Sequence, residues 1–423
     1  MSEPQAVFSA ARIAELMADA PERAILPTPQ QTEVIEQPLG DSVLVVAGAG
    51  SGKTETMANR VVWIVANGLA DPSQVLGLTF TRKAAGELGS RITERLIRFA
   101  ERLELARQSG QLSADEGARA QELATLLSDG LDLPEVSTYN AFASAIVQEF
   151  GAIAGVSAGA TVIDASRAWG IAREIVREST EPGLVASTDS VAVVVKQLMT
   201  LDHAVSDNLT SFEAVQRSIR DLDRLGTLPY NDKKTEGQYA GVRDVLANMQ
   251  ATELAVRLAG QFASAKRERG LIEFSDQLAL AVETLRRSAD AVRVLRARTP
   301  VVLLDEVQDT SVGQTALLSM LFQGNSVMAV GDPHQSIYGF RGASASNLQT
   351  FHRDFRAQGA AEHLAKTLTL STSWRNPATV LAAANTISAP LAAKLEAESD
   401  TIAVRPLTSK AQYLGVSDQT DHP

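Results

Sequence analysis

Five short runs of apolar residues, each ending in a polar or glycine-containing turn, limit what this chain can fold into. Runs that stay apolar throughout are typical of parallel strands that are buried on both faces of a sheet. In an open α/β sheet the carboxyl ends of such strands form the edge at which ligands bind. We therefore predict an α/β fold whose parallel sheet contains Val43–Ala47, Val75–Phe80, Val301–Leu304, Val327–Val330 and Leu368–Leu370.

Two long segments between the second and third predicted strands favour helices. Residues 98–129 are rich in Ala, Leu, Glu and Arg at helical spacing. Residues from about 152 to 270 form a second helical block. Because this block is far longer than a simple crossover between strands needs, we expect an inserted helical subdomain. Residues 1–20 have the pattern of a short amphipathic leader helix.

Composition and charge bound the class of protein more loosely. The 423 residues are 45% hydrophobic and 21% charged, as in ordinary globular proteins, and allow two or three domains. The absence of cysteine excludes disulfides and thiolate zinc sites, and the five histidines show no close pairing. The net charge of −11 argues against a general nucleic-acid coat but leaves room for a local basic channel. Without a signal segment or an apolar run of about 18 residues, we expect a cytoplasmic protein with no membrane partner.

The turn after the first predicted strand has the composition of a phosphate-binding loop. Three glycines within Gly48–Gly52 let successive backbone N–H groups point inward, and the helix expected from Thr54 to Asn67 adds its positive end. Lys53 can reach the β- and γ-phosphates of a nucleotide, and Thr54 can bind Mg²⁺. The alternative is a glycine-rich loop with Lys53 as a solvated charge. The preceding strand and following helix favour the nucleotide site.

Two acidic residues follow the strand Val301–Leu304. Asp305 is placed to hold Mg²⁺, commonly through water, and Glu306 is placed as the general base for an attacking water. On local sequence alone a solvated acidic turn is an equal alternative, because short acidic motifs are common. The loop at Lys53 favours the catalytic interpretation, in which the chain binds and hydrolyses ATP.

A third turn, Gly331–Ala343, follows the strand Val327–Val330. Its Gln335 can sense the γ-phosphate and its Arg341 can carry charge there. The aromatic residues Tyr338 and Phe340 could stack on nucleobases, although packing in the core is the alternative that composition alone favours.

The last motif, Ser373–Pro377, opens a predicted helix with Asn376 as its N-cap and Pro377 at its first position. Trp374 could stack on adenine, and Arg375 could stabilise the transition state of phosphoryl transfer. A buried tryptophan beside a surface arginine explains the same residues equally well.

Taken in order, these motifs resemble those of the superfamily 1 UvrD/Rep/PcrA-type DNA helicases over about residues 26–385. The most specific match is Gly331–Ala343, which is close to the family's GDxxQSIYGWRGA. The other matching segments are Leu26–Gln31 (Q motif), Ala47–Thr54 (alanine-first phosphate loop), Thr79–Leu88 (motif Ia), Ser137–Phe142 (a TFHSF-like DNA-contact segment), Ile272–Asp276 (an acidic-aromatic segment), Asp305–Ser311 (DEFQDT), and Trp374–Arg375 with Leu381–Asn385 (motif IV).

The resemblance implies a P-loop, RecA-like fold and a 3′→5′ DNA helicase or translocase. Such a protein couples hydrolysis of ATP with Mg²⁺ to movement on single-stranded or 3′-tailed duplex DNA, in repair or recombination. The implied catalytic residues are Glu306, Gln335, Arg341 and Arg375. The implied ATP-binding residues are Gln30, Gly48, Ala49, Gly50, Ser51, Gly52, Lys53, Thr54 and Trp374, with Thr54 and Asp305 on the metal. The implied DNA contacts are Phe80, Thr81, Thr138, Tyr139, Tyr338 and Phe340.

The resemblance also divides the chain and leaves a choice of function. The expected parts are a leader helix (1–20), a RecA-like lobe in two parts (21–150, with a helical insertion at about 98–130, and 271–368), a 1B-like helical subdomain (151–270), and the start of a truncated second lobe (369–423). Motifs V and VI of the family have no counterpart, so a partner polypeptide could supply the second lobe. The rival interpretation is a truncated ATP- and DNA-binding module with little or no independent motor activity, and a weaker one is a subunit of a helicase–nuclease complex.

Four residues depart from the family pattern. Arg82, Asn140 and Phe340 stand where Asn, His and Trp are usual, and Glu55 stands where several relatives place an adenine-contacting Arg. These departures affect the expected contacts with DNA or base and leave the phosphate site intact.

Overall fold

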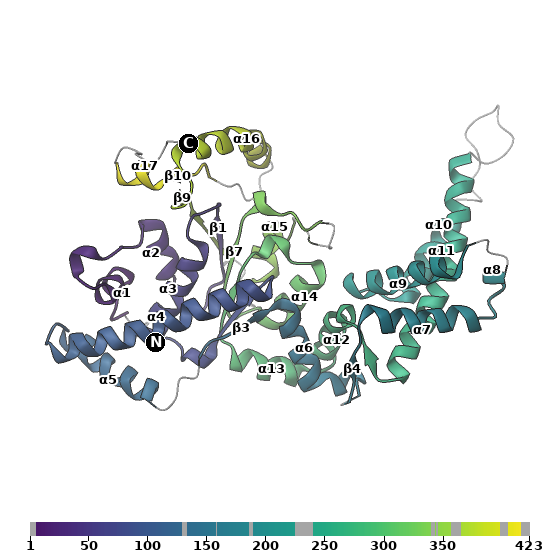
Figure 1. Cartoon of the computed structure of the whole chain (residues 1–423), viewed down its shortest axis with the longest axis horizontal. Coiled ribbons are helices and arrows are strands. Elements are labelled where there is room, and N and C mark those ends of the chain that lie inside the picture. Colours follow the sequence, from purple (N-terminus) through teal and green to yellow (C-terminus); the bar gives the residue numbers. More distant parts are fainter. Residues whose placement is uncertain are drawn as a thin grey trace. The chain divides into compact units, whose positions relative to one another are not determined.

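The computed structural model describes residues 6–128, 133–157, 159–185, 189–224, 240–339, 343, 346–356, 365–397 and 405–415. Two compact units make up the chain (Figure 1). Unit 1 combines Met1–Phe142 with Asp290–Pro423, and unit 2 is Ala143–Ala289.

A six-stranded sheet forms the centre of unit 1, and all its strand pairs are parallel. Its order is β3-β2-β6-β7-β1-β8. The strands are β1 (Val43–Ala47), β2 (Val75–Thr79), β3 (Glu135–Thr138), β6 (Val301–Leu304), β7 (Ser326–Gly331) and β8 (Lys366–Leu370). Five of them match the predicted apolar runs to within two residues, so the α/β fold class with a parallel sheet is confirmed. Strand β3 was not predicted.

The apolar runs are continuous because both faces of the sheet are covered. In β1, Val43, Val45 and Ala47 belong to one core cluster with residues of the N-terminal helices. The alternate residues Leu44 and Val46 lie on the opposite face and are also buried. Helix α15 packs against β1, whereas α3 and α4 pack on each other and α4 packs on β2 and β3. The helices of unit 1 are α1 (Ala10–Met17), α2 (Pro29–Ile35), α3 (Lys53–Ala66), α4 (Arg82–Gln108), α5 (Ala114–Ser128), α13 (Ala289–Arg298), α14 (Val312–Phe322), α15 (Ser346–Asp354), α16 (Ala378–Ala397) and α17 (Lys410–Leu414).

Three helix predictions need correction. The leader helix is only α1, because the Ser9 hydroxyl caps its start by accepting from Arg12 N–H and the chain is extended at Ala18; residues 1–5 lie outside the described part. The stretch 98–129 is the end of α4 followed by α5, since Gly110 turns the chain with φ +69°. Helix α16 begins at Ala378, one residue later than predicted, and the residue predicted as its cap instead donates its backbone N–H to Ser373 Oγ.

A buried arginine joins helices α2 and α3. Arg60 of α3 is 1% exposed and donates to the carbonyl oxygens of Val34, Ile35 and Gln37 at 2.7–3.1 Å. Burial lowers the pKa of Arg60 to about 10. These bonds satisfy carbonyls at the C-terminal end of α2, and so fix α2 against the helix that follows the glycine loop.

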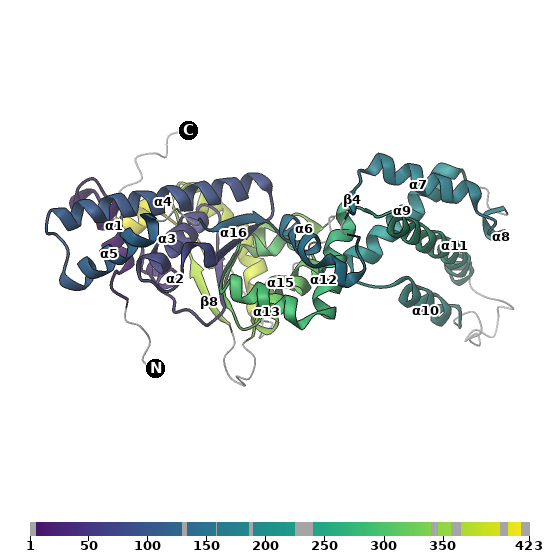
Figure 2. The same cartoon turned by 90° about the horizontal axis from the view of Figure 1, so that it is seen from below.

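Unit 2 is mainly helical, in agreement with the predicted helical insertion (Figure 2). Its core is built from α7, α9 and α11 and includes Leu198 and Phe262, which are fully buried. Its elements are η3 (Gly151–Ala154), β4 (Thr161–Val162), α7 (Ala165–Glu178), α8 (Pro182–Val185), α9 (Val191–Asp207), α10 (Phe212–Asp223), α11 (Ala240–Glu268), β5 (Leu271–Ile272) and α12 (Phe274–Arg287), and α6 (Tyr139–Phe150) crosses from unit 1. None of the helices in the described ranges is long and apolar enough to cross a membrane.

Candidate active site

The predicted motifs of unit 1 meet at one edge of its sheet. All six strands are parallel, so their carboxyl ends share that edge (Figure 1). The residues there are Gly48–Gly52 after β1, Phe80 and Thr81 after β2, Thr138 and Tyr139 at the end of β3, Asp305 and Glu306 after β6, Asp332–Gln335 after β7, and Ser371–Arg375 after β8.

The glycine loop is bent by two residues in the left-handed region. Gly50 has φ +76° and Gly52 has φ +83°, which other residues adopt only with strain. A Cβ at Gly50 would also lie 2.7 Å from Ser373 Oγ and 2.9 Å from Arg375 Cβ. The close approach of the segment after β8 therefore requires glycine at position 50.

Hydrogen bonds turn the carbonyl groups of this loop toward neighbouring residues. Ser51 Oγ donates to the carbonyl of Gly48 at 2.8 Å. The carbonyl of Ala49 accepts from Ser373 Oγ at 3.0 Å, and that of Gly50 accepts from Trp374 N–H at 2.8 Å. A loop that binds an anion needs its carbonyl oxygens tied elsewhere and its N–H groups gathered, and this arrangement suits phosphate.

The residues expected to handle phosphate and water lie together. Lys53 is the first residue of α3, and its Nζ lies 3.1 Å from Glu306 Oε2 and 3.3 Å from Oε1. Thr54 follows it in the first turn of α3 and is half-buried. The positive end of α3 and the Lys53 ammonium thus lie at the same edge as the Glu306 carboxylate.

Glu306 has an unusual backbone conformation. Its φ of 52° and ψ of 46° place it in the left-handed region, which in the described part of the chain only Leu209 shares among non-glycine residues with positive φ. This conformation costs roughly 1–2 kcal/mol and persists only where surrounding contacts impose it. The Glu306 carboxylate also accepts from Gln308 Nε2 at 2.8 Å. Strain at a candidate general base supports a functional role.

Asp305 is buried beneath the same edge. Burial, with the neighbouring charge of Glu306, raises the pKa of Asp305 to about 7. Its Oδ1 accepts from Glu306 N–H at 3.0 Å, and its main-chain carbonyl accepts from Tyr139 Oη at 2.7 Å. A bound Mg²⁺ would favour the ionised form of this carboxylate and so offset the cost of burying it.

Gln335 is connected to the base through two intermediate residues. Its Nε2 donates to Asp332 Oδ2, and Asp332 N–H donates to Gln308 Oε1 at 3.0 Å. Gln308, which is 1% exposed, then donates to Glu306. The turn after β7 thus contacts the general base through a buried amide.

A cavity of about 690 Å³ opens beside the glycine loop. Its lining includes Gly52, Trp374, Gln31 and Glu55, and the buried indole Nε1 of Trp374 has no hydrogen-bond partner among the described residues. The lining is part apolar and part charged, with Ile13 and Met17 as well as Arg91 and Arg95, and the Trp374 ring offers a surface on which a nucleobase can stack. Trp374 also packs edge-on against Tyr413 of α17.

The two glutamines at the start of α2 have different surroundings. Gln30, predicted to read adenine, uses its amide to bind Ser371, whose N–H donates to its Oε1 at 2.9 Å. Gln31 lines the cavity instead, and a Cβ at Gly52 would lie 3.1 Å from its Nε2. Gln31 was not among the predicted residues. The signal that could have revealed it is the capping box Thr28-Pro29-Gln30-Gln31, in which Gln31 Oε1 accepts from Thr28 N–H.

Two of the expected DNA-contact aromatics form a pair. The rings of Phe80 and Tyr338 lie 4.8 Å apart between centroids and are inclined by 34°. Thr81 and Thr138 both cap helices, by accepting from Ala84 N–H and Ala141 N–H. Phe340 and Arg341 lie outside the described residues.

Tyr139 does not lie on an open surface. It is 3% exposed and points its hydroxyl at the residue expected to hold the metal. Arg375 is exposed beside Gly50 at the end of the glycine loop.

Comparison with known proteins agrees with this arrangement. The protein-family model named UvrD/REP helicase N-terminal domain matches residues 27–356, more than half of the chain. The chain belongs to the UvrD/REP helicase family. The sequence-based identification of the family is thereby confirmed.

Relatives of this UvrD/REP family member are named as DNA helicases or as a subunit of the RecBCD enzyme. RecBCD enzyme subunit RecB of Mycolicibacterium smegmatis is 29% identical over 83% of this chain and 29% of its own length. ATP-dependent DNA helicase PcrA of Leuconostoc citreum is 26% identical over 85% of this chain and 38% of its own length. DNA helicase II of Haemophilus influenzae is 24% identical over 85% of this chain and 40% of its own length. The chain therefore spans well under half the length of these relatives.

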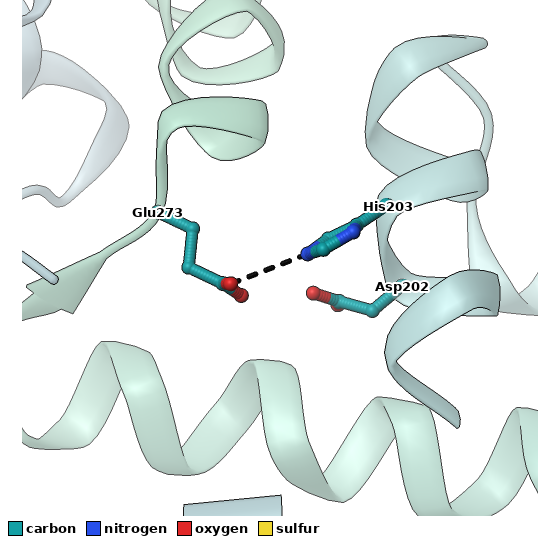
Figure 3. A group of neighbouring side chains, drawn as sticks. All are labelled: Asp202, His203 and Glu273. Atoms are coloured by element: carbon teal, nitrogen blue, oxygen red, sulfur yellow. Dashed lines mark hydrogen bonds and ion pairs between the residues drawn. The ribbon is translucent and has the colours of Figure 1, made fainter. Parts of the chain in front are cut away.

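The acidic-aromatic segment of this family member belongs to a polar cluster in unit 2. Asp202, His203 and Glu273 converge with possible ligand atoms within 4.8 Å of one another (Figure 3). Lys266 is the cation of this cluster: its Nζ lies 2.6 Å from Asp202, 2.8 Å from Glu273 and 2.9 Å from Asp276. Burial raises the pKa of Asp202 to about 6. We interpret the cluster as a buried ion network that joins α9, α11 and the start of α12.

Proposed function

We propose that this chain is the ATP-binding portion of a 3′→5′ DNA helicase or translocase that couples ATP hydrolysis to movement on single-stranded DNA. The observation that carries the proposal is the approach of Lys53 Nζ to within 3.1 Å of the strained Glu306 carboxylate at the sheet edge. The cation expected to bind phosphate and the expected general base therefore lie side by side, where both can reach the γ-phosphate of a bound nucleotide.

The residues at this edge fit ATP and Mg²⁺. Mg²⁺ neutralises phosphate charge when bound, and Thr54 and Asp305 would hold it. Lys53 binds the β- and γ-phosphates, and Glu306 accepts a proton from the attacking water. Trp374 and Gln31 support this assignment because they line the cavity beside the loop, where a base would lie.

The polar and exposed residues nearby have supporting roles. Gln335 orients the γ-phosphate side of the site through Asp332 and Gln308. Arg375, exposed beside the loop, stabilises the charge that develops in phosphoryl transfer, and we assign the same role to Arg341 from the motif alone.

For DNA, the Phe80–Tyr338 pair supports a stacking platform for unpaired bases. Thr81 and Thr138 lie at the ends of neighbouring strands beside it and would contact the backbone. The 3′→5′ direction rests on the likeness of Gly331–Ala343 to the family motif. The substrate we propose is single-stranded or 3′-tailed duplex DNA, in repair or recombination.

The relative named RecBCD enzyme subunit RecB supports a further part of the proposal. A second motor lobe, from a partner polypeptide or from a longer chain, would complete the machine. The chain by itself would then bind ATP and DNA and turn over slowly.

The proposal is tested by measuring ATP hydrolysis and ATP binding of this chain with and without single-stranded DNA. We expect ATP binding that Lys53→Ala abolishes, and hydrolysis that DNA stimulates. Binding of both ligands without hydrolysis would support the rival interpretation of a binding module. No binding of ATP would overturn the proposal.

A further inference from the structure

We propose that Tyr139 is a positioning residue for the general base. Its hydroxyl, together with the Asp305 carboxylate, holds the peptide between Asp305 and Glu306 in the orientation that gives Glu306 its left-handed backbone. The catalytic meaning of this inference rests on the proposed function, whereas the clamp itself is a property of the fold.

The clamp grips one peptide group from both ends. Tyr139 Oη donates to the carbonyl oxygen of Asp305 at 2.7 Å, which fixes one end. The N–H of Glu306 donates to Asp305 Oδ1 at 3.0 Å, which fixes the other. Because φ of Glu306 describes rotation next to this peptide, a peptide held at both ends cannot turn to relieve the left-handed conformation.

Burial makes the Tyr139 bond difficult to replace with water. The tyrosine is 3% exposed and Asp305 is 5% exposed. A tyrosine phenol, whose ordinary pKa is about 10, is protonated at neutral pH and able to donate. If the hydroxyl is removed, the carbonyl of Asp305 loses a short hydrogen bond in a place that solvent does not reach.

The residue after Tyr139 contacts the chain just beyond the acidic turn that follows β6. Asn140 Oδ1 accepts from Gln314 Nε2 at 3.0 Å. Gln314 is the third residue of α14, the helix that follows the acidic turn, and it forms a capping box with Ser311. Consecutive residues at the end of β3 therefore contact the chain on both sides of Glu306–Thr310.

This arrangement gives the segment 137–142 a second role. Thr138, expected to contact DNA, directly precedes the tyrosine. A shift of this segment on DNA would move the Asp305–Glu306 peptide through one hydrogen bond.

The test is Tyr139→Phe, which keeps the ring and removes the hydroxyl. We expect hydrogen–deuterium exchange at the amides of Glu306 and Val307 to rise about tenfold, the effect of losing one buried hydrogen bond. We expect kcat for ATP in saturating single-stranded DNA to fall about tenfold, while KM for ATP stays within about twofold.

Thr299→Val is the matched control. Its hydroxyl donates to the Leu295 carbonyl at 3.0 Å, just before the opposite end of β6. It should leave both kcat and exchange at residues 305–307 unchanged. Wild-type exchange in Tyr139→Phe, or an equal rise in both variants, would overturn the clamp. Faster exchange with unchanged kcat would overturn its catalytic role, and absence of hydrolysis by the wild-type chain would instead reject the proposed function.

Discussion

The Lys53 ammonium and the Glu306 carboxylate lie 3.1 Å apart, although 253 positions separate the two residues in the chain. They extend from the ends of β1 and β6, between which β7 lies in the sheet. The pair therefore depends on the order of the strands, and each partner can be tested separately.

Glu306→Gln should keep nucleotide binding and reduce hydrolysis by about 10²–10⁴-fold, because the amide accepts no proton from water. Lys53→Ala should lose nucleotide binding, because the loop then lacks its phosphate cation. Titration with a fluorescent nucleotide and a phosphate-release assay separate the two effects. Normal turnover in Glu306→Gln would show that the base lies elsewhere.

The raised pKa of Asp305 predicts how stability changes with pH. Its folded-state pKa of about 7 lies above the value of about 3.9 for an unfolded aspartate. Between these values the folded chain holds a proton that the unfolded chain has lost, so the contribution of Asp305 to stability decreases as pH rises. Asp305→Asn should become more stable relative to wild type by up to about 1.4 kcal/mol per pH unit in this window.

Denaturant unfolding of both proteins at pH 5, 6 and 7, without Mg²⁺, measures this difference. A difference that stays constant with pH would contradict the raised pKa. Mg²⁺ should reduce this difference in stability between the two proteins, because it stabilises wild type by binding the ionised carboxylate.

Single-stranded DNA binding should depend on the Phe80–Tyr338 pair. Replacing either ring with alanine should weaken binding by about 1–3 kcal/mol, the usual contribution of one stacked base. The slope of log affinity against log salt should stay unchanged, because no phosphate contact is removed. Fluorescence anisotropy over a series of salt concentrations measures both quantities. An unchanged affinity together with an unchanged slope would indicate that these rings are packing residues and do not stack on bases.

In unit 2, Lys266→Met should destabilise the fold by about 3–5 kcal/mol, because it leaves two buried carboxylates and one half-buried carboxylate without this cation. The control is Arg269→Met, which breaks an exposed ion pair with Glu174 and should cost at most about 1 kcal/mol. Thermal unfolding of both variants makes the comparison. Equal, small losses would show that the cluster contributes little.

The sequence predicted four strands whose burial is complete and the apolar end of the partly exposed β8, and it missed the partly exposed β3. Residues of β1 and β6 are buried throughout and give unbroken apolar runs. Strand β3 reads Glu-Val-Ser-Thr, is half-exposed and lies at the edge of the sheet, so it carries no such pattern. Its position follows only from its pairing with β2.

The site was predictable where adjacent residues share one turn, and less so where distant helices meet. The local motif predicts Lys53 as a phosphate ligand, and Glu306 is predicted as the general base only when the two motifs are taken together. The choice between Gln30 and Gln31 depends on which amide faces the loop, which the capping box at Thr28 decides. Contacts between distant helices could not be predicted from the sequence. Glu55 of α3, for example, pairs with Arg95 of α4, and no local pattern predicts that contact.

The bonds from Ser373 and Trp374 to the glycine loop have a consequence for how such proteins are dissected. These bonds come from a segment more than 320 positions downstream of the carbonyls that they hold. A shortened protein that ends before β8 would still contain the complete phosphate-loop sequence, but its loop would lack the hydrogen bonds from Ser373 and Trp374. Weak nucleotide binding by such a protein would reflect the missing hydrogen bonds and would not contradict the assignment of the phosphate loop.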